Sequence, residues 1–393
     1  MWNSRQLHVT FPHACPSEPP HRRIVVRGNV AEPLRNARYG SLPLLQVTFH
    51  RIARWAAVVF GVGTLLAAQP ALSTGSAARP RHYLVVAVIK PHYKSIVEIV
   101  DARGRRERLV QKPQLAQTYA AWSPDRSMVA WTTHAGIMVE RASGSRRRLV
   151  FSQPKDRCST CMPLTFAWSP DSRRLLVGGA GRQTNRLLTI PLNGGRATDV
   201  VRPRALTEYR VIGWAPNGRQ IAYQRTSGTY GNDVELIVAK PDGTNRRSLF
   251  RLQEPIHDYF EGAFSPDSRS IAFSTPNRAP HDPTLAIVNV ATGAVHRLKG
   301  GWGGQRPAWS PDSKRLAVAL GSRTVTMTTA GGRIHSLLEV TGASLAWSPR
   351  GRITIAGPDA QPWKIFASRN GIAAAKLLFT LPRNVAVVDI DPQ

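Results

Sequence analysis

The sequence predicts an all-β fold, a closed β-propeller of four-stranded blades. A motif of an aromatic residue, a small residue, Pro and usually Asp recurs six times. Its aromatic residues are Trp122, Trp168, Trp214, Phe264, Trp309 and Trp347. They lie 46, 46, 50, 45 and 38 residues apart, which is the length of a four-stranded blade. Gly-containing turns between the copies, as at Asp242-Gly243, favour hairpins.

The chemistry of the motif predicts how each blade begins. The aromatic residue ends a short apolar strand and offers a large face to the next blade. Pro presets φ for a tight turn, and Asp accepts hydrogen bonds from its own backbone. An apolar second strand follows, as in Arg174–Val177. We therefore expect all six aromatic side chains to be buried at equivalent places between blades.

Strands at the two ends of the repeat region predict how the ring closes. Three strands precede the first motif, at Tyr83–Val88, Ile96–Asp101 and Glu107–Val110, and one follows the last, at Val385–Asp391. Together they make one more four-stranded blade, which protects the sheet edges. Seven blades are predicted, and six remain the alternative if the terminal strands pack differently.

The motifs resemble the WSPDG-type repeats of the TolB-like propeller family over residues 83–393. This resemblance is specific for fold and says little about function. It implies that the motif aspartates Asp125, Asp171, Asp267 and Asp312 are turn residues. TolB-like proteins bind other proteins through a propeller face, and six blades are typical of TolB itself.

The sequence before the predicted propeller divides into two segments. Residues 1–46 are rich in Pro, Arg and His without periodicity, and we expect them to be disordered. Residues 47–78 contain an apolar run at 55–68, preceded by Arg51 and Arg54 and followed by small residues. This pattern is typical of a secretory signal. An uncleaved membrane anchor through residues 55–78 is the alternative, and a translation start at Val47 would explain the long leader.

The charge balance predicts association with polyanions. The chain has 53 Lys and Arg against 24 Asp and Glu, a net charge of +29. The basic residues, mostly Arg, occur in every blade, and an arginine bias also arises from a GC-rich genome. We therefore expect weak, salt-sensitive binding to nucleic acid, anionic lipid or acidic glycan, without a specific nucleic-acid site.

Three cysteines are too few for a disulfide framework. Cys158 and Cys161 form a lone CxxC, for which an exported protein favours a local disulfide. Free thiols and a metal or redox role are the alternatives. We expect no cofactor and no metal.

Candidate binding residues lie where inner strands begin, at one mouth of the central channel. The position three before each motif aromatic gives Tyr119, Thr165, Val211, Glu261, Arg306 and Ser344. Their differing chemistry suits a pocket for a polar ligand and not a ring of metal ligands. Two neighbouring polar clusters complete the set, His257-Asp258-Tyr259 and His281-Asp282.

These features favour a non-catalytic, monomeric binding scaffold that is exported to the periplasm, the cell surface or the medium. Linear catalytic signatures such as G-x-S-x-G and HExxH do not occur in the sequence. The expected partner is an envelope protein or a polar ligand. The alternative is a propeller enzyme that acts on a glycan or lactone at the channel mouth.

Overall fold

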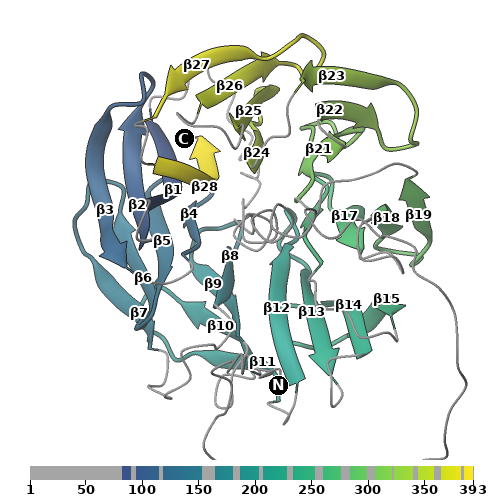
Figure 1. The fold of residues 1–393 in the computed structure, drawn as a ribbon. Coiled ribbons are helices and arrows are strands. Elements are labelled where there is room, and N and C mark those ends of the chain that lie inside the picture. Colours follow the sequence, from purple (N-terminus) through teal and green to yellow (C-terminus); the bar gives the residue numbers. More distant parts are fainter. Residues whose placement is uncertain are drawn as a thin grey trace, which may run out of the picture.

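The computed structural model shows a ring of seven four-stranded antiparallel sheets (Figure 1), which confirms the predicted fold and blade count. It describes residues 82–89, 94–114, 118–152, 164–179, 186–202, 207–227, 233–252, 260–275, 284–298, 306–320, 323–339, 344–357, 364–381 and 385–392. The predicted segments 1–46 and 47–78 lie outside the described residues.

Each blade runs from its inner to its outer strand in the following order. Blade 1 is β28 (Val385–Pro392), β1 (His82–Ile89), β2 (Lys94–Asp101) and β3 (Arg106–Gln114). Blade 2 is β4 (Ala120–Trp122), β5 (Met128–Thr133), β6 (Gly136–Arg141) and β7 (Arg148–Ser152). Blade 3 is β8 (Thr165–Trp168), β9 (Arg174–Gly178), β10 (Leu187–Pro191) and β11 (Thr198–Val201). Blade 4 is β12 (Thr207–Trp214), β13 (Ile221–Ser227), β14 (Asp233–Ala239) and β15 (Arg247–Leu252).

The remaining blades follow the same order. Blade 5 is β16 (Gly262–Phe264), β17 (Ser270–Thr275), β18 (Thr284–Asn289) and β19 (Val295–Leu298). Blade 6 is β20 (Ala308–Trp309), β21 (Arg315–Leu320), β22 (Arg323–Thr328) and β23 (Ile334–Leu338). Blade 7 is β24 (Ser344–Trp347), β25 (Arg352–Gly357), β26 (Lys364–Arg369) and β27 (Lys376–Thr380).

Blade 1 closes the ring with strands from both ends of the chain. The inner strand β28 pairs antiparallel with β1, from Tyr83 opposite Pro392 to Ile89 opposite Val385. β1 therefore has a partner on each side, as the sequence predicts, and the terminal strands are hydrogen-bonded across the closure.

The motif builds the turn from the first to the second strand of blades 2 to 7. In blade 2, Ser123 Oγ donates to Asp125 Oδ1 at 2.6 Å and accepts the Met128 N–H at 2.9 Å. Asp125 also accepts the Ser127 N–H at 3.0 Å. The aspartates in blades 3, 5 and 6 accept the equivalent N–H group, as does Asn217 in blade 4. The motif aspartates are therefore turn residues.

The residue after the motif Asp, or after Asn217 in blade 4 and Arg350 in blade 7, adopts a left-handed conformation in each of these six blades. The φ angle is 58° at Ser172, 73° at Gly218 and 81° at Gly351, and Arg126 has 61°. Glycine takes this conformation without the steric cost that a Cβ imposes. The serines at this position also link blades, because Ser172 Oγ accepts the Asp125 N–H of the preceding blade at 3.1 Å.

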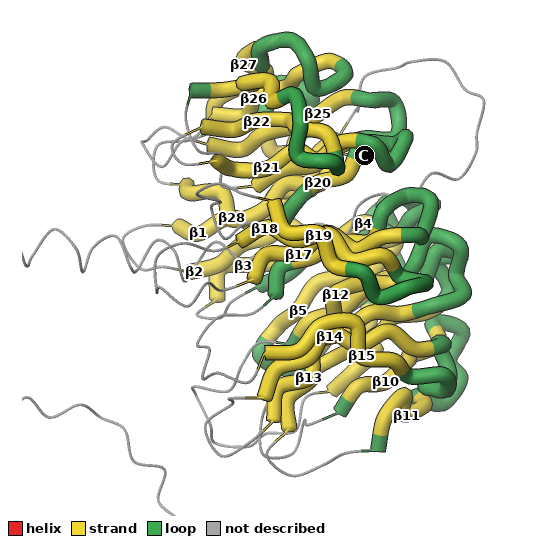
Figure 2. Tube along the Cα trace, turned by 90° about the vertical axis from the view of Figure 1, so that its right-hand side faces the viewer, coloured by secondary structure: helices red, strands yellow, loops and turns green. Residues whose placement is uncertain are grey.

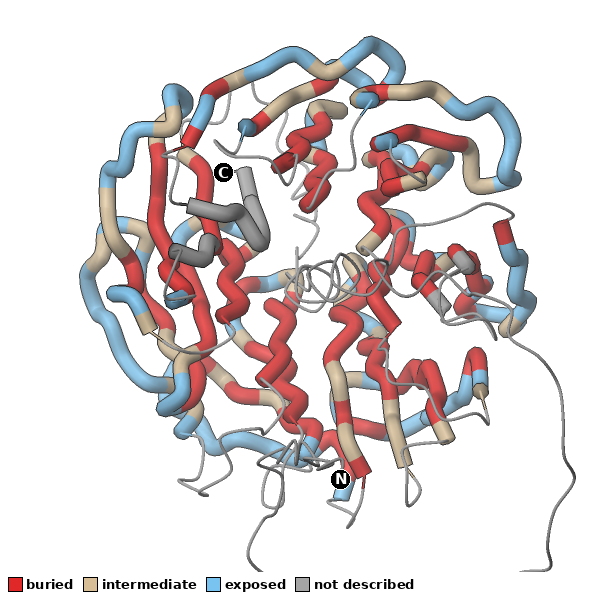
Figure 3. Tube along the Cα trace, viewed as in Figure 1, coloured by how far each residue is buried: buried red, intermediate tan, exposed pale blue. Residues whose placement is uncertain are grey.

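The motif aromatics are buried where neighbouring blades meet, as predicted. Their exposed fractions range from 1% at Trp168 to 6% at Trp347. Trp168 packs with Ala121, Ala130 and Val139 of blade 2, and its Nε1 donates to the Ala121 carbonyl at 3.2 Å. Figure 3 shows the inner strands as mostly buried and the outer strands as the exposed circumference of the ring.

Blades 2 to 7 each have two tight turns and blade 1 has one, and these turns lie on the same side of the ring, the right-hand side of Figure 2. These are the turn between the first and second strands and the turn between the third and fourth. They are hydrogen-bonded to each other, for example by the Leu192 N–H to the Arg173 carbonyl at 2.9 Å.

Among the described residues, no helix has the length and apolar character that crossing a membrane requires.

Candidate functional site

The six positions predicted from the repeat lie at or next to the innermost strands, but the contacts do not join them into one site. Five of them are buried, and Arg306 is the partly exposed member. Tyr119 packs in the apolar cluster between blades 2 and 3, and Val211 packs in the cluster between blades 3 and 4. Glu261 and Arg306 are brought together.

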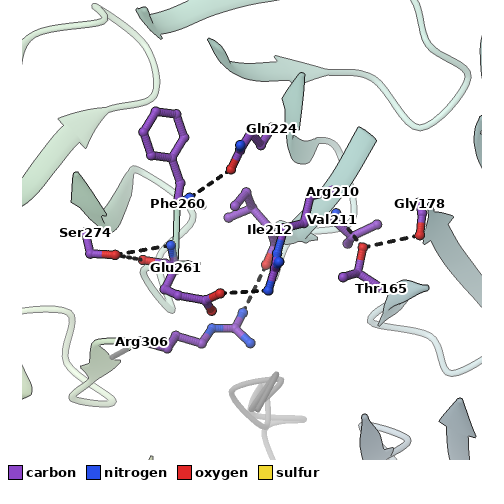
Figure 4. Close-up of polar contacts among 10 residues, drawn as sticks. All are labelled: Thr165, Gly178, Arg210, Val211, Ile212, Gln224, Phe260, Glu261, Ser274 and Arg306. Atoms are coloured by element: carbon purple, nitrogen blue, oxygen red, sulfur yellow. Dashed lines mark hydrogen bonds and ion pairs between the residues drawn. The ribbon is translucent and has the colours of Figure 1, made fainter. Parts of the chain in front are cut away.

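Glu261 lies between two arginines that belong to the neighbouring blades (Figure 4). Arg210 on β12 of blade 4 donates from its guanidinium group to Glu261 Oε1 at 2.8 Å. The side chains of Arg210 and Glu261 are 11% and 8% exposed. Arg306 of blade 6 extends its guanidinium group toward the same carboxylate and donates to the Ile212 carbonyl at 3.0 Å. We call Arg210, Glu261 and Arg306 the inner-edge cluster.

Burial dominates the electrostatics of Glu261. Removal from water raises the pKa of its carboxyl group above the usual range, and the charges of Arg210 and Arg306 oppose this shift. Glu208, which precedes Arg210 by two residues on β12, also has its pKa raised by burial. The cluster therefore combines two permanent positive charges with a carboxylate that takes up a proton more readily than an exposed one.

Hydrogen bonds from the sheets fix the backbone around Glu261. The Phe260 N–H donates to Gln224 Oε1 of blade 4 at 2.8 Å, and the Glu261 N–H donates to Ser274 Oγ at 3.2 Å. Gln224 is 1% exposed. These contacts hold the carboxylate on rigid strands, which is how a precise polar site is built.

The polar residue Thr165 has a structural role between blades 3 and 4. Its hydroxyl group accepts the Val211 N–H at 2.9 Å and is 3.4 Å from the carbonyl oxygen of Gly178 (Figure 4). The side chain is 2% exposed. Thr165 thus joins the inner strands of two blades, away from the inner-edge cluster.

Sequence reasoning missed Arg210 because a β-bulge changes the side-chain alternation of β12. The β12–β13 register passes from Val211 opposite Tyr223 to Gly213 opposite Ala222, so Ile212 is the extra residue. The extra residue turns Val211 toward blade 3 and Arg210 toward blade 5. Counting three residues back from Trp214 therefore selects Val211 in place of Arg210. The isolated Gly213 inside β12 is the sequence signal that could have indicated a bulge.

Several predicted residues lie outside the described parts of the chain. They are His257, Asp258, Tyr259, His281 and Asp282 of the two polar clusters, and Cys158 and Cys161 of the CxxC pair. Ser344 begins β24 and is 6% exposed. Within the described residues, no group of three or more His, Cys, Asp or Glu side chains is arranged to hold a metal ion.

Comparison with known proteins adds a fold relationship. No family model matches the chain. A prolyl endopeptidase structure is similar with a TM-score of 0.54 and 14% identity, over 85% of this chain and 52% of that one. The chain thus spans about half the length of that enzyme. An oligogalacturonate lyase from Vibrio parahaemolyticus has a TM-score of 0.53 and 8% identity, over 72% of this chain and 90% of that one.

TolB from Acinetobacter baumannii is also among the similar structures. Its TM-score is 0.41 with 14% identity, over 78% of this chain and 83% of that one. At 14% and 8% identity, the similarities to the prolyl endopeptidase and to the lyase show a shared propeller fold and leave activity open.

Proposed function

We propose that this protein is an exported, non-catalytic β-propeller that binds a protein or polar ligand of the cell envelope at the inner edge of blades 4 to 6. The inner-edge cluster carries this proposal. Arg210 and Arg306 present planar donor groups beside one carboxylate, and strand hydrogen bonds fix their neighbours. A guanidinium group suits ligands that offer carboxylate or carbonyl oxygens.

The sequence supports the export and the binding role. The apolar run at 55–68 with its basic flank is typical of secretion. The resemblance of the motifs to the TolB-like family favours a protein partner, because members of that family bind proteins through a propeller face. Arg210 and Arg306 are both partly exposed residues, although the Nε and Nη1 atoms of Arg306 are buried.

The test compares two variants of blade 6 that remove the same charge. Arg306→Gln alters the cluster, and Arg323→Gln alters an exposed residue at the start of β22. Each protein is cross-linked in envelope extract, and the captured molecules are quantified by mass spectrometry. We expect a partner that the wild type and Arg323→Gln retain and that Arg306→Gln loses. Equal capture by all three proteins would refute a binding role for the cluster.

One observation favours the enzymatic alternative, an activity on a glycan or lactone. A buried carboxyl group with a raised pKa is the usual form of a general acid, and Glu261 is such a group. The two functions differ in turnover. Both proteins are incubated with acidic oligosaccharides and with lactones. If the chain is an enzyme, the wild type should form product and Glu261→Gln should form none. If the chain is a binding protein, neither should form product.

A further inference from the structure

The basic charge of the propeller is concentrated on one side of the ring. We define the turn face as the thirteen tight turns that join first to second and third to fourth strands, with the strand residue on either side of each turn. The turn face contains 23 Lys and Arg, six Asp and no Glu. All other described residues together contain 12 Lys and Arg and 11 Asp and Glu. The sequence places basic residues on every blade, and the topology gathers them on one face.

The antiparallel order of the strands produces this segregation. Both tight turns of a blade lie at the same end of its sheet, as the hydrogen bond from the Ala142 N–H to the Ser127 carbonyl shows in blade 2. Seven of the thirteen turns are followed by a strand that starts with Arg or Lys. Of the 23 basic residues, 19 are exposed. The face therefore carries a net positive charge in six of the seven blades, while in blade 5 the charges of Arg269 and Asp267 balance.

Several of these arginines are oriented by backbone carbonyl groups of a neighbouring blade. Arg246 donates to the Val200 carbonyl at 2.8 Å, and Arg315 donates to the Asn370 carbonyl at 2.7 Å. A carbonyl group orients a guanidinium group without neutralising its charge. These contacts stabilise the ring and leave the positive potential of the face in place.

The exposed aliphatic side chains lie at the same end of the sheets. The large hydrophobic residues that the described structure exposes are Leu149, Val295, Ile334, Ile372 and Leu377. Four of them are the first or second residue of an outermost strand that leaves a tight turn, and Ile372 lies within such a turn. Ile334 and Ile372 are 49% and 56% exposed, on the neighbouring blades 6 and 7.

The N-terminal strand also starts at the turn face. His82 pairs with Asp101, the residue before a tight turn of blade 1, and Tyr83 pairs with Pro392. Residues 69–81 separate the apolar run 55–68 from this strand. Thirteen residues reach at most about 45 Å. An apolar run held in a bilayer would therefore keep the start of β1, which lies at the turn face, within about 45 Å of the membrane.

We propose that the turn face docks the propeller onto the surface of a bilayer that contains anionic phospholipids. Basic side chains attract the anionic head groups, and aliphatic side chains at the same surface enter the interface between head groups and acyl chains. A nucleic acid or an acidic glycan would bind the basic side chains, but Ile334 and Ile372 would add nothing to its binding free energy. The combination of both kinds of side chain is what selects a lipid surface.

The test compares two variants, each of which loses four positive charges, one on the turn face and the other on the opposite side of the ring. Arg173, Arg219, Arg269 and Lys314 are exposed at equivalent places in the motif turns of blades 3 to 6, and all four are replaced by Gln. The matched control replaces Lys94, Arg202, Arg323 and Lys364, which are exposed at the opposite ends of the strands. All proteins are full-length and carry Val58→Glu and Leu65→Glu, so that the apolar run does not itself partition.

Binding to phosphatidylcholine vesicles with about 30% phosphatidylglycerol is measured by co-sedimentation at about 0.15 M salt. Each basic residue at an anionic surface contributes about fivefold to partitioning. We expect the turn-face variant, which lacks four such residues, to bind roughly 600-fold more weakly than the parent protein and the control to bind within about fivefold of it. Equal losses in the two variants would overturn the proposal.

A second variant separates a lipid surface from a polyanion. Ile334→Ser with Ile372→Ser leaves every charge in place, so heparin and DNA binding should stay unchanged while vesicle binding falls about tenfold. Unchanged vesicle binding, or an equal fall for heparin, would refute docking on lipid. Retained binding to DNA at about 0.15 M salt with no binding to vesicles would assign the face to nucleic acid instead.

Discussion

Arg306 in blade 6 donates a hydrogen bond at 3.0 Å to the carbonyl oxygen of Ile212 in blade 4. Its guanidinium group therefore passes the inner strand of blade 5 and connects two blades that are not neighbours in the ring. Ile212 is the extra residue of the β12 bulge, so the same irregularity exposes its carbonyl to Arg306 and directs Arg210 to Glu261. Three blades are thus coupled through one buried carboxylate.

The stability of the wild type relative to Glu261→Gln should increase as the pH falls. Burial raises the pKa of Glu261 in the folded protein above the unfolded reference of 4.5. The folded state therefore binds the proton first, and stability increases on acidification between these two pKa values. Urea unfolding of both proteins at several pH values between about 4.5 and 8 measures the difference. A constant difference over this range would contradict the raised pKa.

Replacement of Asp171 by Ala should destabilise the protein by about 1–2 kcal/mol, whereas Asn should cost much less. Asp171 Oδ1 accepts the Arg173 N–H at 3.1 Å, and Asn217 accepts the equivalent N–H of Arg219 at 2.9 Å in blade 4. An amide oxygen can therefore replace the carboxylate oxygen as the hydrogen-bond acceptor in this turn. Thermal unfolding of the two variants provides the comparison, and similar losses would show that the carboxylate charge matters more than the acceptor.

Asp171 should also make the protein sensitive to strong acid. Burial opposes the shift, but the hydrogen bonds from Ser169 and the Arg173 N–H lower the pKa of Asp171 below 3.8. A lowered pKa in the folded state gives stability that is present above 3.8 and is lost as the pH falls through the folded value. Asp171→Asn should reduce the slope of stability against pH below about pH 4. An unchanged slope would exclude this group as a cause.

Arg126→Gly should stabilise the protein by about 0.5–1 kcal/mol, because Arg126 has a φ of 61° and glycine removes the strain of its Cβ. Ser172→Gly is the matched control at the same position of the next blade. There the gain is offset, since Ser172 Oγ accepts the Asp125 N–H at 3.1 Å. Differential scanning calorimetry should give a higher Tm for Arg126→Gly than for Ser172→Gly, and the reverse order would contradict this assignment.

Trp168→Phe should cost about 1 kcal/mol more than Trp347→Phe. Both indole rings are buried, but Trp168 Nε1 donates to the Ala121 carbonyl, while Trp347 Nε1 makes no hydrogen bond within the described residues. Phe retains most of the apolar surface in each case. Truncation of Trp168 to Ala should cost about 3–5 kcal/mol. Equal costs for the two Phe variants would indicate that the indole hydrogen bond contributes nothing.

Much of the fold is predictable because its determinants are local. The Ser-Pro-Asp turns repeat every 38 to 50 residues, and each hydrogen-bonds within itself, as Ser123 and Asp125 do. The seventh blade follows from counting strands at both ends of the chain. The position three residues before each motif aromatic also correctly places Glu261 and Arg306 beside the innermost strands.

The rest depends on non-local geometry. Whether Arg210 or Val211 contacts blade 5 depends on the pairing of β12 with β13, and Gly213 indicates a bulge in β12 without fixing which residue is extra. The turn face was missed for another reason. Counted blade by blade, the basic residues are evenly spread, and only the up-and-down course of the strands assigns Arg173, Arg219 and Arg269 to one side.

The pairing of β1 with β28 also has a consequence for the order of events in time. About 300 residues separate the two strands, and a ribosome adds about 5–20 residues per second. One side of β1 therefore has no partner for roughly 15 to 60 seconds after its own synthesis. The ring cannot close before β28 has been synthesised, and until then the chain is an open array of blades with an unpaired edge at β1.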